Sequence, residues 1–343
     1  MDEQTIDTKA QDGTKITVVG AGSWGTALAN VFADAGAVVT VWAKEPGVVQ
    51  GIQSQRENPV YLKGIPLSER ISATSDLAAA VGSAEVVVCA IPTQFIRGVF
   101  SPVGALLGGK VVVNASKGIE MGTFARVSEI FHSFAPGARY VVLSGPSFAH
   151  EVAKRLPTAV TVASLDRSSA ARVQGLVATP YFRAYRSSDV LGVELAGALK
   201  NVIAIASGIV AGLDLGYNAQ AAIVNRGVAE IVRVGTRLGA QSLTFMGLSG
   251  MGDLILTCTG PLSRNRRLGV GLAQGKSLAA IQGELGGVAE GVTTTQAAYE
   301  LATKFGIEMP ITEQVHRILY EGSTPQKALG ELMSRDLKPE WES

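Results

Sequence analysis

A lysine inside an apolar stretch is the first candidate for chemistry. Lys200 lies in the run LAGALKNVI at residues 195–203, where nearly every other side chain is apolar. Burial strips an ammonium group of its hydration and lowers its pKa. A lysine whose pKa falls to roughly 7 to 8 can donate a proton to an oxyanion at neutral pH and recover it in reverse. The alternatives are a side chain that reaches solvent and one that pairs with Glu194 or Asp189.

Lys117 is a second cation that could support the same oxygen. It follows the apolar run of residues 110–114 in the segment NASKG. The alternative is an ordinary turn lysine in solvent.

Residues 263–267, SRNRR, indicate an anion site at the start of a helix. Ser263 is suited to be the N-cap. A helix N-terminus, a hydroxyl, the Asn265 amide and the Arg264 guanidinium together suit a phosphate monoester, which arginine can bind through two hydrogen bonds. The competing interpretations are a solvated basic turn and a nucleic-acid contact. Three arginines without interleaved aromatic residues disfavour nucleic acid.

Two carboxylates each have two interpretations. Asp253 follows a glycine-rich segment and could accept a hydrogen bond from a substrate hydroxyl, or cap the next segment. Glu290, in GVAEG, could contact a cofactor amide or stand at a helix start.

A glycine pattern predicts a dinucleotide cofactor. The β-branched run of residues 16–19 leads into GAGSWG, residues 20–25, and then into a helical pattern. Gly20 allows the tight turn, Gly22 leaves room for phosphates, and Gly25 lets the helix pack on the strand. The amides of the first helical turn would attract the pyrophosphate. The alternative is a strand-to-helix turn without a ligand.

The end of the next strand favours NADP over NAD. NAD-selective sites usually place Asp or Glu here, whereas this chain has Trp42, Ala43 and Lys44. Lys44 could pair with a 2′-phosphate. The alternative is a solvated lysine, and the neighbouring Glu45 leaves dual cofactor use open. A hydride carrier, a proton-donating lysine and an arginine that binds phosphate together predict reduction of a phosphorylated ketone.

The elements that position these residues follow an α/β order. Strand-like runs at 38–42, 85–91, 110–114, 140–143, 159–163 and 182–186 alternate with helical patterns and predict a Rossmann-type doubly wound sheet. Helical patterns at 190–212, 217–238, 268–274, 293–304 and 312–320 predict an all-α C-terminal domain, with loops at 247–253 and 258–261. We expect a disordered tail over 1–14, a dinucleotide-binding domain over 15–188 and a helical substrate-binding domain over 189–338.

The bulk properties are those of a soluble globular chain. Its 343 residues are 47% hydrophobic and 17% charged, with a net charge of +1, so no overall field favours nucleic acid or an anionic membrane. The apolar run 202–213 is too short to span a bilayer. Cys89 and Cys258 are far apart, which suggests buried thiols in a reducing compartment, and the three histidines show no metal-ligand spacing.

From Lys15 to about Leu332 the chain resembles the bacterial NAD(P)-dependent glycerol-3-phosphate dehydrogenases. The resemblance is carried in order by residues 20–29, ASKG at 115–118, SGPSFA at 144–149, LKNV at 199–202, GMGDL at 250–254 and SRNRR at 263–267.

The resemblance implies interconversion of dihydroxyacetone phosphate and sn-glycerol 3-phosphate for glycerophospholipid synthesis, by a cytoplasmic enzyme that is commonly a homodimer. Lys200 would exchange the proton. The implied substrate-binding residues are Lys117, Gly145, Ser147, Lys200, Asp253, Ser263, Arg264 and Asn265. The implied cofactor contacts are Ser23, Trp24, Lys44, Lys117, Ala149, Arg264, Val288 and Glu290. The family more often has Arg at position 44, which weakens the expected NADP preference, and the tail before Lys15 is extra.

Two rival interpretations remain. A β-hydroxyacid dehydrogenase or ketopantoate reductase also joins a Rossmann domain to helices bearing a lysine, but the cluster at residues 263–267 argues against a carboxylate substrate. A redox sensor that binds NADPH without turnover would have little need for a desolvated Lys200.

Overall fold

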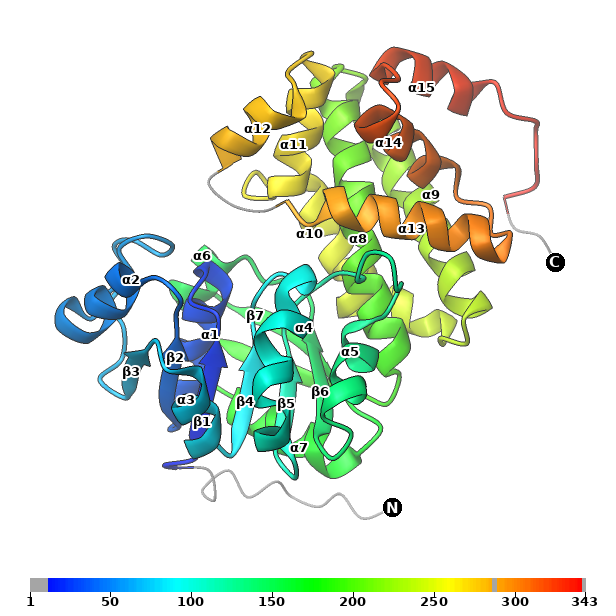
Figure 1. Ribbon diagram of the computed structural model, residues 1–343. Helices are drawn as coiled ribbons and strands as arrows, with labels where there is room; N and C mark the ends of the chain where they lie inside the picture. The colour runs from blue at the N-terminus through cyan, green and yellow to red at the C-terminus, as the bar shows by residue number, and fades with distance from the viewer. Residues whose placement is uncertain (1–11, 286–288, 341–343) are drawn as a thin grey trace.

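The chain forms a sheet domain followed by a helical domain that lies over the carboxyl ends of most of the strands (Figure 1). The structure is a computed structural model and describes residues 12–285 and 289–340. Within those residues the sheet has eight strands in the order β3-β2-β1-β4-β5-β6-β7-β8. All neighbours pair in parallel except β6 and β7, which are antiparallel. The predicted doubly wound sheet and all-α C-terminal domain are confirmed.

Seven of the strands fall on the apolar runs that predicted them or on the run before the glycine turn. The strand β3 and the antiparallel pairing were not predicted. The strands are β1 Lys15–Val19, β2 Val38–Trp42, β3 Ile71–Thr74, β4 Val86–Cys89, β5 Val111–Asn114, β6 Arg139–Ser144, β7 Thr158–Ala163 and β8 Phe182–Ser187. The predicted run at 182–186 forms β8, which extends to Ser187.

The central strands are apolar on both faces because helices cover both sides of the sheet. In β4, Val86 and Val88 belong to one buried cluster, while Val87 and Cys89 belong to another on the opposite face. Alternate side chains of a strand point to opposite faces, so continuous apolar runs are typical of such a sheet. The helices of this domain are α1 Ser23–Asp34, α2 Pro46–Gln50, α3 Leu77–Ser83, α4 Ile96–Phe100, α5 Val127–Phe134, α6 Ala149–Ala153 and α7 Arg167–Leu176.

The helical domain is built around α8, Val190–Gly212, which is buried over most of its length. By length and composition α8 could cross a membrane, but 89% of its apolar window is buried inside the protein, as in a core helix. The other helices are α9 Gly216–Arg237, α10 Asp253–Thr259, α11 Arg264–Ala273, α12 Leu278–Leu285, α13 Gly291–Phe305, α14 Pro310–Tyr320 and α15 Pro325–Met333.

Three expectations need correction. The segment predicted as a loop at 247–253 contains a π-helical turn, Leu248–Gly252, that continues into α10. Cys258 and Thr259, assigned to the second loop, close α10 itself. The last residues of the predicted tail are ordered: Asp12 pairs with Arg70 at 2.9 Å, and Gly13 donates to the Gly36 carbonyl. Residues 1–11 of that tail lie outside the described residues.

Candidate active site

The glycine turn after β1 has the geometry a pyrophosphate needs. Gly20 has φ +116°, and a Cβ there would lie 2.5 Å from the Ala90 carbonyl oxygen. A Cβ on Gly25 would lie 1.9 Å from the Gly20 carbonyl oxygen, so this glycine permits α1 to pack on the strand. A Cβ on Gly22 would meet nothing within 4 Å, and Gly22 supplies no side-chain cap to α1. The first-turn amides are therefore available to an anion, and the turn fits a dinucleotide.

Side chains beside the turn tie it to neighbouring loops. Trp24 donates from Nε1 to the Ala115 carbonyl at 3.2 Å, next to the segment that carries Lys117. Ser23 donates to the Tyr61 carbonyl at 2.6 Å. The buried Asn58 donates to the Ala21 carbonyl at 2.7 Å. These bonds hold residues 58–61 against the start of α1.

Lys44 lies exposed just beyond β2, where its ammonium group is open to solvent. The adjacent Glu45 carboxylate accepts a hydrogen bond from the Tyr61 hydroxyl at 3.2 Å. A cation and a carboxylate thus stand side by side at the end of this strand.

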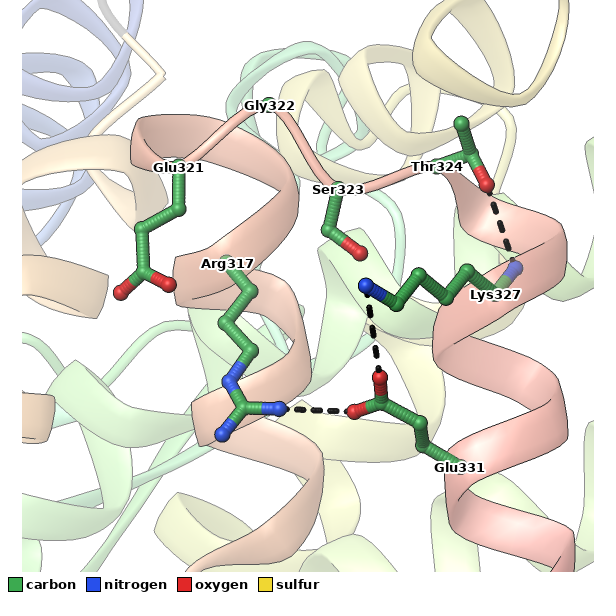
Figure 2. Close-up of a pocket in the computed structure, with 7 residues that line it drawn as sticks. All are labelled: Arg317, Glu321, Gly322, Ser323, Thr324, Lys327 and Glu331. Carbon is green, nitrogen blue, oxygen red and sulfur yellow. Dashed lines mark hydrogen bonds and ion pairs between the residues drawn. The ribbon is translucent and has the colours of Figure 1, made fainter.

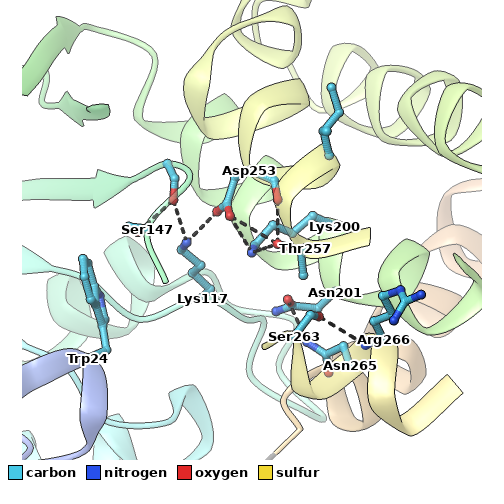
Figure 3. Close-up of polar contacts among 12 residues, drawn as sticks. Trp24, Lys117, Ser147, Lys200, Asn201, Asp253, Thr257, Ser263, Asn265 and Arg266 are labelled. Atoms are coloured by element: carbon cyan, nitrogen blue, oxygen red, sulfur yellow. Dashed lines mark hydrogen bonds and ion pairs between the residues drawn. The ribbon is translucent and has the colours of Figure 1, made fainter. Parts of the chain in front are cut away.

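Two lysines from different domains share one buried carboxylate (Figure 3). Lys200 of α8 donates to Asp253 Oδ1 at 2.8 Å and to the Thr257 hydroxyl at 2.6 Å. Lys117, which follows β5, donates to Asp253 Oδ2 at 2.5 Å and to the Gly145 carbonyl at 3.3 Å. Lys200 is only 6% exposed. Its ammonium group therefore lies between the domains, and the solvent-reaching alternative is wrong.

The other proposed partners of Lys200 are occupied elsewhere. Glu194 pairs with Arg126 at 3.0 Å, and Asp189 caps α8 by accepting from the Gly192 amide at 2.9 Å. Neither carboxylate is bonded to Lys200.

Burial lowers the pKa of Lys200 to about 8; the Asp253 charge opposes that shift and the Lys117 charge adds to it. Burial alone would raise the pKa of Asp253, but the charges of Lys117 and Lys200 outweigh it and the pKa falls. At neutral pH the cluster therefore holds two ammonium groups on one carboxylate, with Lys200 poised to lose its proton.

Ser263 caps α11 as predicted, accepting from the Arg266 amide at 3.2 Å. The Arg264 side chain is exposed, and within residues 12–285 and 289–340 no ion pair involves it. Asn265 is buried: its Nδ2 donates to Asn201 Oδ1 at 2.9 Å, and its Oδ1 accepts from the Gly291 amide at 3.0 Å. The cluster thus offers the exposed Arg264 guanidinium beside a fixed amide.

The loop after β6 is shaped by a glycine at φ +149°. A Cβ on Gly145 would lie 2.9 Å from Val160 Cα. The Gly145 carbonyl accepts from Ser147 at 2.9 Å as well as from Lys117, so this loop lies beside the lysine pair. Ala149 begins α6 directly after it. Val288 lies outside the described residues.

Glu290 connects the two domains. It precedes α13 but makes no side-chain cap there; its carboxylate instead accepts from the Thr93 amide beyond β4, at 3.3 Å. Burial raises its pKa to about 7. A half-buried carboxylate beside the strand ends fits a group that accepts from a cofactor amide.

Sequence reasoning missed two residues of the site. Thr257 lies four residues after Asp253 on α10, so both face the same side of the helix and both bond Lys200. That spacing is a usable signal once the segment is known to be helical. Asn201, next to Lys200, holds Asn265 in place, and its signal is a polar side chain in an otherwise apolar helix.

A separate cavity of about 260 Å³ lies between α14 and α15 (Figure 2). Its Arg317 and Lys327 already face Glu331, at 2.7 Å and 3.9 Å. The charges of the cavity are therefore largely satisfied among themselves, and none of its lining residues belongs to the lysine cluster.

The Rossmann-type turn, with a buried lysine of lowered pKa at the edge of a helical domain, defines an NAD(P)-dependent dehydrogenase. The models of the N-terminal and C-terminal parts of NAD-dependent glycerol-3-phosphate dehydrogenase match residues 15–170 and 189–330. The chain belongs to this family, as its resemblance implied.

Relatives support that assignment. The chain is 52% identical over 330 residues to glycerol-3-phosphate dehydrogenase [NAD(P)+] of Citrifermentans bemidjiense, covering 95% of this chain and 98% of the relative. It is 50% identical to the enzyme of the same name from Myxococcus xanthus, covering 94% and 98%. The crystal structure of glycerol-3-phosphate dehydrogenase from Coxiella burnetii superposes with a TM-score of 0.91 at 38% identity, covering 94% and 99%.

One rival interpretation has a counterpart at the level of fold. A putative ketopantoate reductase from Ralstonia solanacearum has a TM-score of 0.59 at 18% identity, covering 93% of this chain and 99% of that one. This likeness shows a shared fold alone, so the substrate has to be argued from the site.

Proposed function

We propose that this protein reduces dihydroxyacetone phosphate to sn-glycerol 3-phosphate with NAD(P)H, reversibly, and supplies glycerophospholipid synthesis. The observation that carries the proposal is the buried Lys200, whose pKa is lowered. Its ammonium group is hydrogen-bonded to Asp253 and Thr257, and Lys117 pairs with the same Asp253 carboxylate. The names of the relatives support the same substrate pair and either cofactor.

Lys200 donates a proton to the carbonyl oxygen as it gains negative charge, and takes it back in the oxidation. A nicotinamide cofactor, when bound, would supply the hydride. Asp253 and Thr257 fix the direction of the Lys200 Nζ, because both accept its hydrogen bonds. Lys117 adds a second positive charge beside the same oxygen, which stabilises the developing oxyanion where water is excluded.

The substrate's phosphate would bind at the start of α11. Arg264 supplies an exposed guanidinium, Ser263 and Asn265 supply polar groups, and the helix N-terminus favours negative charge. Gly145 and Ser147, beside Lys117, would line the other side.

For the cofactor, Gly20, Gly22, Ser23, Trp24 and Gly25 would surround the pyrophosphate. Lys44 would favour the 2′-phosphate of NADP, because its ammonium group lies just beyond β2 and can pair with that phosphate. The remaining cofactor contacts that we propose are Lys117, Ala149, Arg264, Val288 and Glu290. The family resemblance also supports a cytoplasmic homodimer. The end of the strand pattern near residue 188 supports a domain boundary between residues 188 and 189.

The test is loss of NADPH absorbance with dihydroxyacetone phosphate, compared with ketopantoate at equal concentration. We expect turnover with dihydroxyacetone phosphate and none with ketopantoate. Turnover with ketopantoate and none with dihydroxyacetone phosphate would overturn the proposal. Lys200→Ala should reduce turnover about 100- to 10,000-fold, the usual contribution of a general acid, while NADPH binding measured by fluorescence is retained. Wild-type turnover in that variant would remove Lys200 from the mechanism.

A further inference from the structure

A buried carboxylate outside the lysine cluster fastens α8 to the sheet domain. Glu194 is 8% exposed and accepts four hydrogen bonds. Its Oε1 accepts from the Ser128 amide at 2.8 Å and the Tyr140 hydroxyl at 2.6 Å. Its Oε2 accepts from the Ser128 hydroxyl at 2.6 Å and from Arg126 at 3.0 Å. Full satisfaction of this kind makes a buried carboxylate a geometrically specific anchor.

The donors belong to the sheet domain, whereas Glu194 stands on the helix that carries Lys200. Ser128 lies in the first turn of α5, and Tyr140 lies on β6. Lys200 follows Glu194 by six residues, about 9 Å along the helix axis. The anchor is therefore less than two helical turns from the proton donor.

Between the anchor and Lys200, α8 lies directly against the Lys117 side chain. A Cβ on Gly197 would stand 3.4 Å from Lys117 Cγ and 3.0 Å from Ser144 Oγ. Val193 packs with Val142 and Ala163 of the sheet. A slide or rotation of α8 would thus change the place of Lys200 relative to Lys117 and to the strand ends.

We propose that Glu194 is a positioning residue for the proton transfer: its carboxylate sets the register of α8 on the sheet domain and so places Lys200 against the groups that the sheet domain carries. The inference rests on the proposed reduction. The Lys200–Asp253 bond lies within the helical domain and can survive without Glu194, whereas the placement of that pair relative to the cofactor-bearing sheet depends on the anchor. Displacements near 1 Å can cost about a hundredfold in rate.

The chain offers a matched control in Glu230 of α9. This carboxylate is 2% exposed and accepts from the Ile311 and Thr312 amides and the Thr312 hydroxyl, at the start of α14. Like Glu194, it is a buried carboxylate that accepts hydrogen bonds from the first turn of another helix. All its partners, however, belong to the helical domain. Its loss should disturb stability without moving Lys200 relative to the sheet.

The experiment compares Glu194→Gln with Glu230→Gln in the full chain, with rates expressed per NADPH-binding site. Each is assayed with NADPH and with NADPH deuterated at the transferred position. We expect Glu194→Gln to lower kcat about 10- to 100-fold, with an isotope effect at least as large as in wild type and an NADPH dissociation constant within about threefold. Glu230→Gln should keep kcat within about twofold.

Milder variants cover the case in which Glu194→Gln fails to fold. Tyr140→Phe and Ser128→Ala each remove one donor and keep the carboxylate, and each should lower kcat by a smaller factor with the same isotope signature. A kcat per binding site within twofold of wild type in all the anchor variants would overturn the inference. So would an equal loss in Glu230→Gln. Absence of turnover by the wild-type protein would instead reject the proposed function itself.

Discussion

Replacing Asp253 by Asn should move the pH dependence of the reaction to lower pH. The proposed reduction would need protonated Lys200, whose pKa of about 8 is set chiefly by burial, by the opposing charge of Asp253 and by the Lys117 charge. Wild-type kcat for reduction should therefore fall as pH rises through about 8, while kcat for oxidation rises. Asn removes the largest of the charge effects that raise this pKa and leaves burial and the Lys117 charge, which lower it.

The size of the shift follows from the contact. The Lys200 Nζ lies 2.8 Å from Asp253 Oδ1, and an opposite charge at such a distance commonly moves a pKa by about one to three units. Each unit corresponds to about 1.4 kcal/mol and to a tenfold change in protonated fraction above the midpoint. At pH 9 the kcat for reduction by Asp253→Asn should thus be about 10- to 1000-fold lower than that of wild type. This factor comes in addition to any loss of kcat that the variant already shows at pH 6.

The assay is kcat from pH 5.5 to 9.5 with saturating NADPH and dihydroxyacetone phosphate. Thr257→Val is the matched control, because it removes the other hydrogen-bond partner of Lys200 and leaves the charge in place. The kcat of Thr257→Val should fall, while the midpoint of its pH profile should move less than the midpoint for Asp253→Asn. A midpoint that moves upward in Asp253→Asn, or equally in both variants, would refute the electrostatic role of Asp253.

Three further outcomes test the binding residues. Arg264→Ala should raise the KM for dihydroxyacetone phosphate about tenfold or more, whereas Arg267→Ala, an exposed arginine on the same helix, should leave it nearly unchanged; equal effects would exclude a phosphate role. Lys44→Asp should lower kcat/KM for NADPH at least tenfold relative to NADH, and an unchanged ratio would mean that another residue binds the 2′-phosphate. Gly22→Ala should fold normally, because its Cβ meets no protein atom, and still bind NADPH more weakly in titrations; Gly25→Ala should instead lower the Tm, since its Cβ would strike the Gly20 carbonyl.

Local patterns predicted much of this fold because the signals are local. The run before the glycine turn, the strand at 38–42 and the helix at 190–212 are observed with the predicted bounds or nearly so. Ser263 was predicted as an N-cap from its place before a helical pattern, and it is one. By contrast, α10 is seven residues long between glycine-rich segments, so its periodicity is too short to be distinguished from a loop.

Contacts between distant segments could not be predicted in the same way. Lys117 and Asp253 are 136 residues apart, and Arg126 and Glu194 are 68 apart. The order of the strands brings such residues together, and one sequence does not specify side-chain partners across that separation. The residue types of the cluster were therefore predictable, but the sharing of one carboxylate by two lysines was not.

That sharing explains why the site suits a developing oxyanion. Lys117, Lys200 and Asp253 together carry a net charge of +1 where water is largely excluded, since the two most buried members are 6% and 2% exposed. A buried, unbalanced positive charge is costly in the free protein, and a negative charge formed on a substrate oxygen relieves that cost. Glu290, whose pKa burial raises to about 7, is partly protonated at neutral pH and so cancels only part of this excess. In the proposed reaction this attraction would grow as the oxyanion forms, so the cluster would stabilise the transition state more than the neutral ketone, which is the condition for catalysis rather than tight binding.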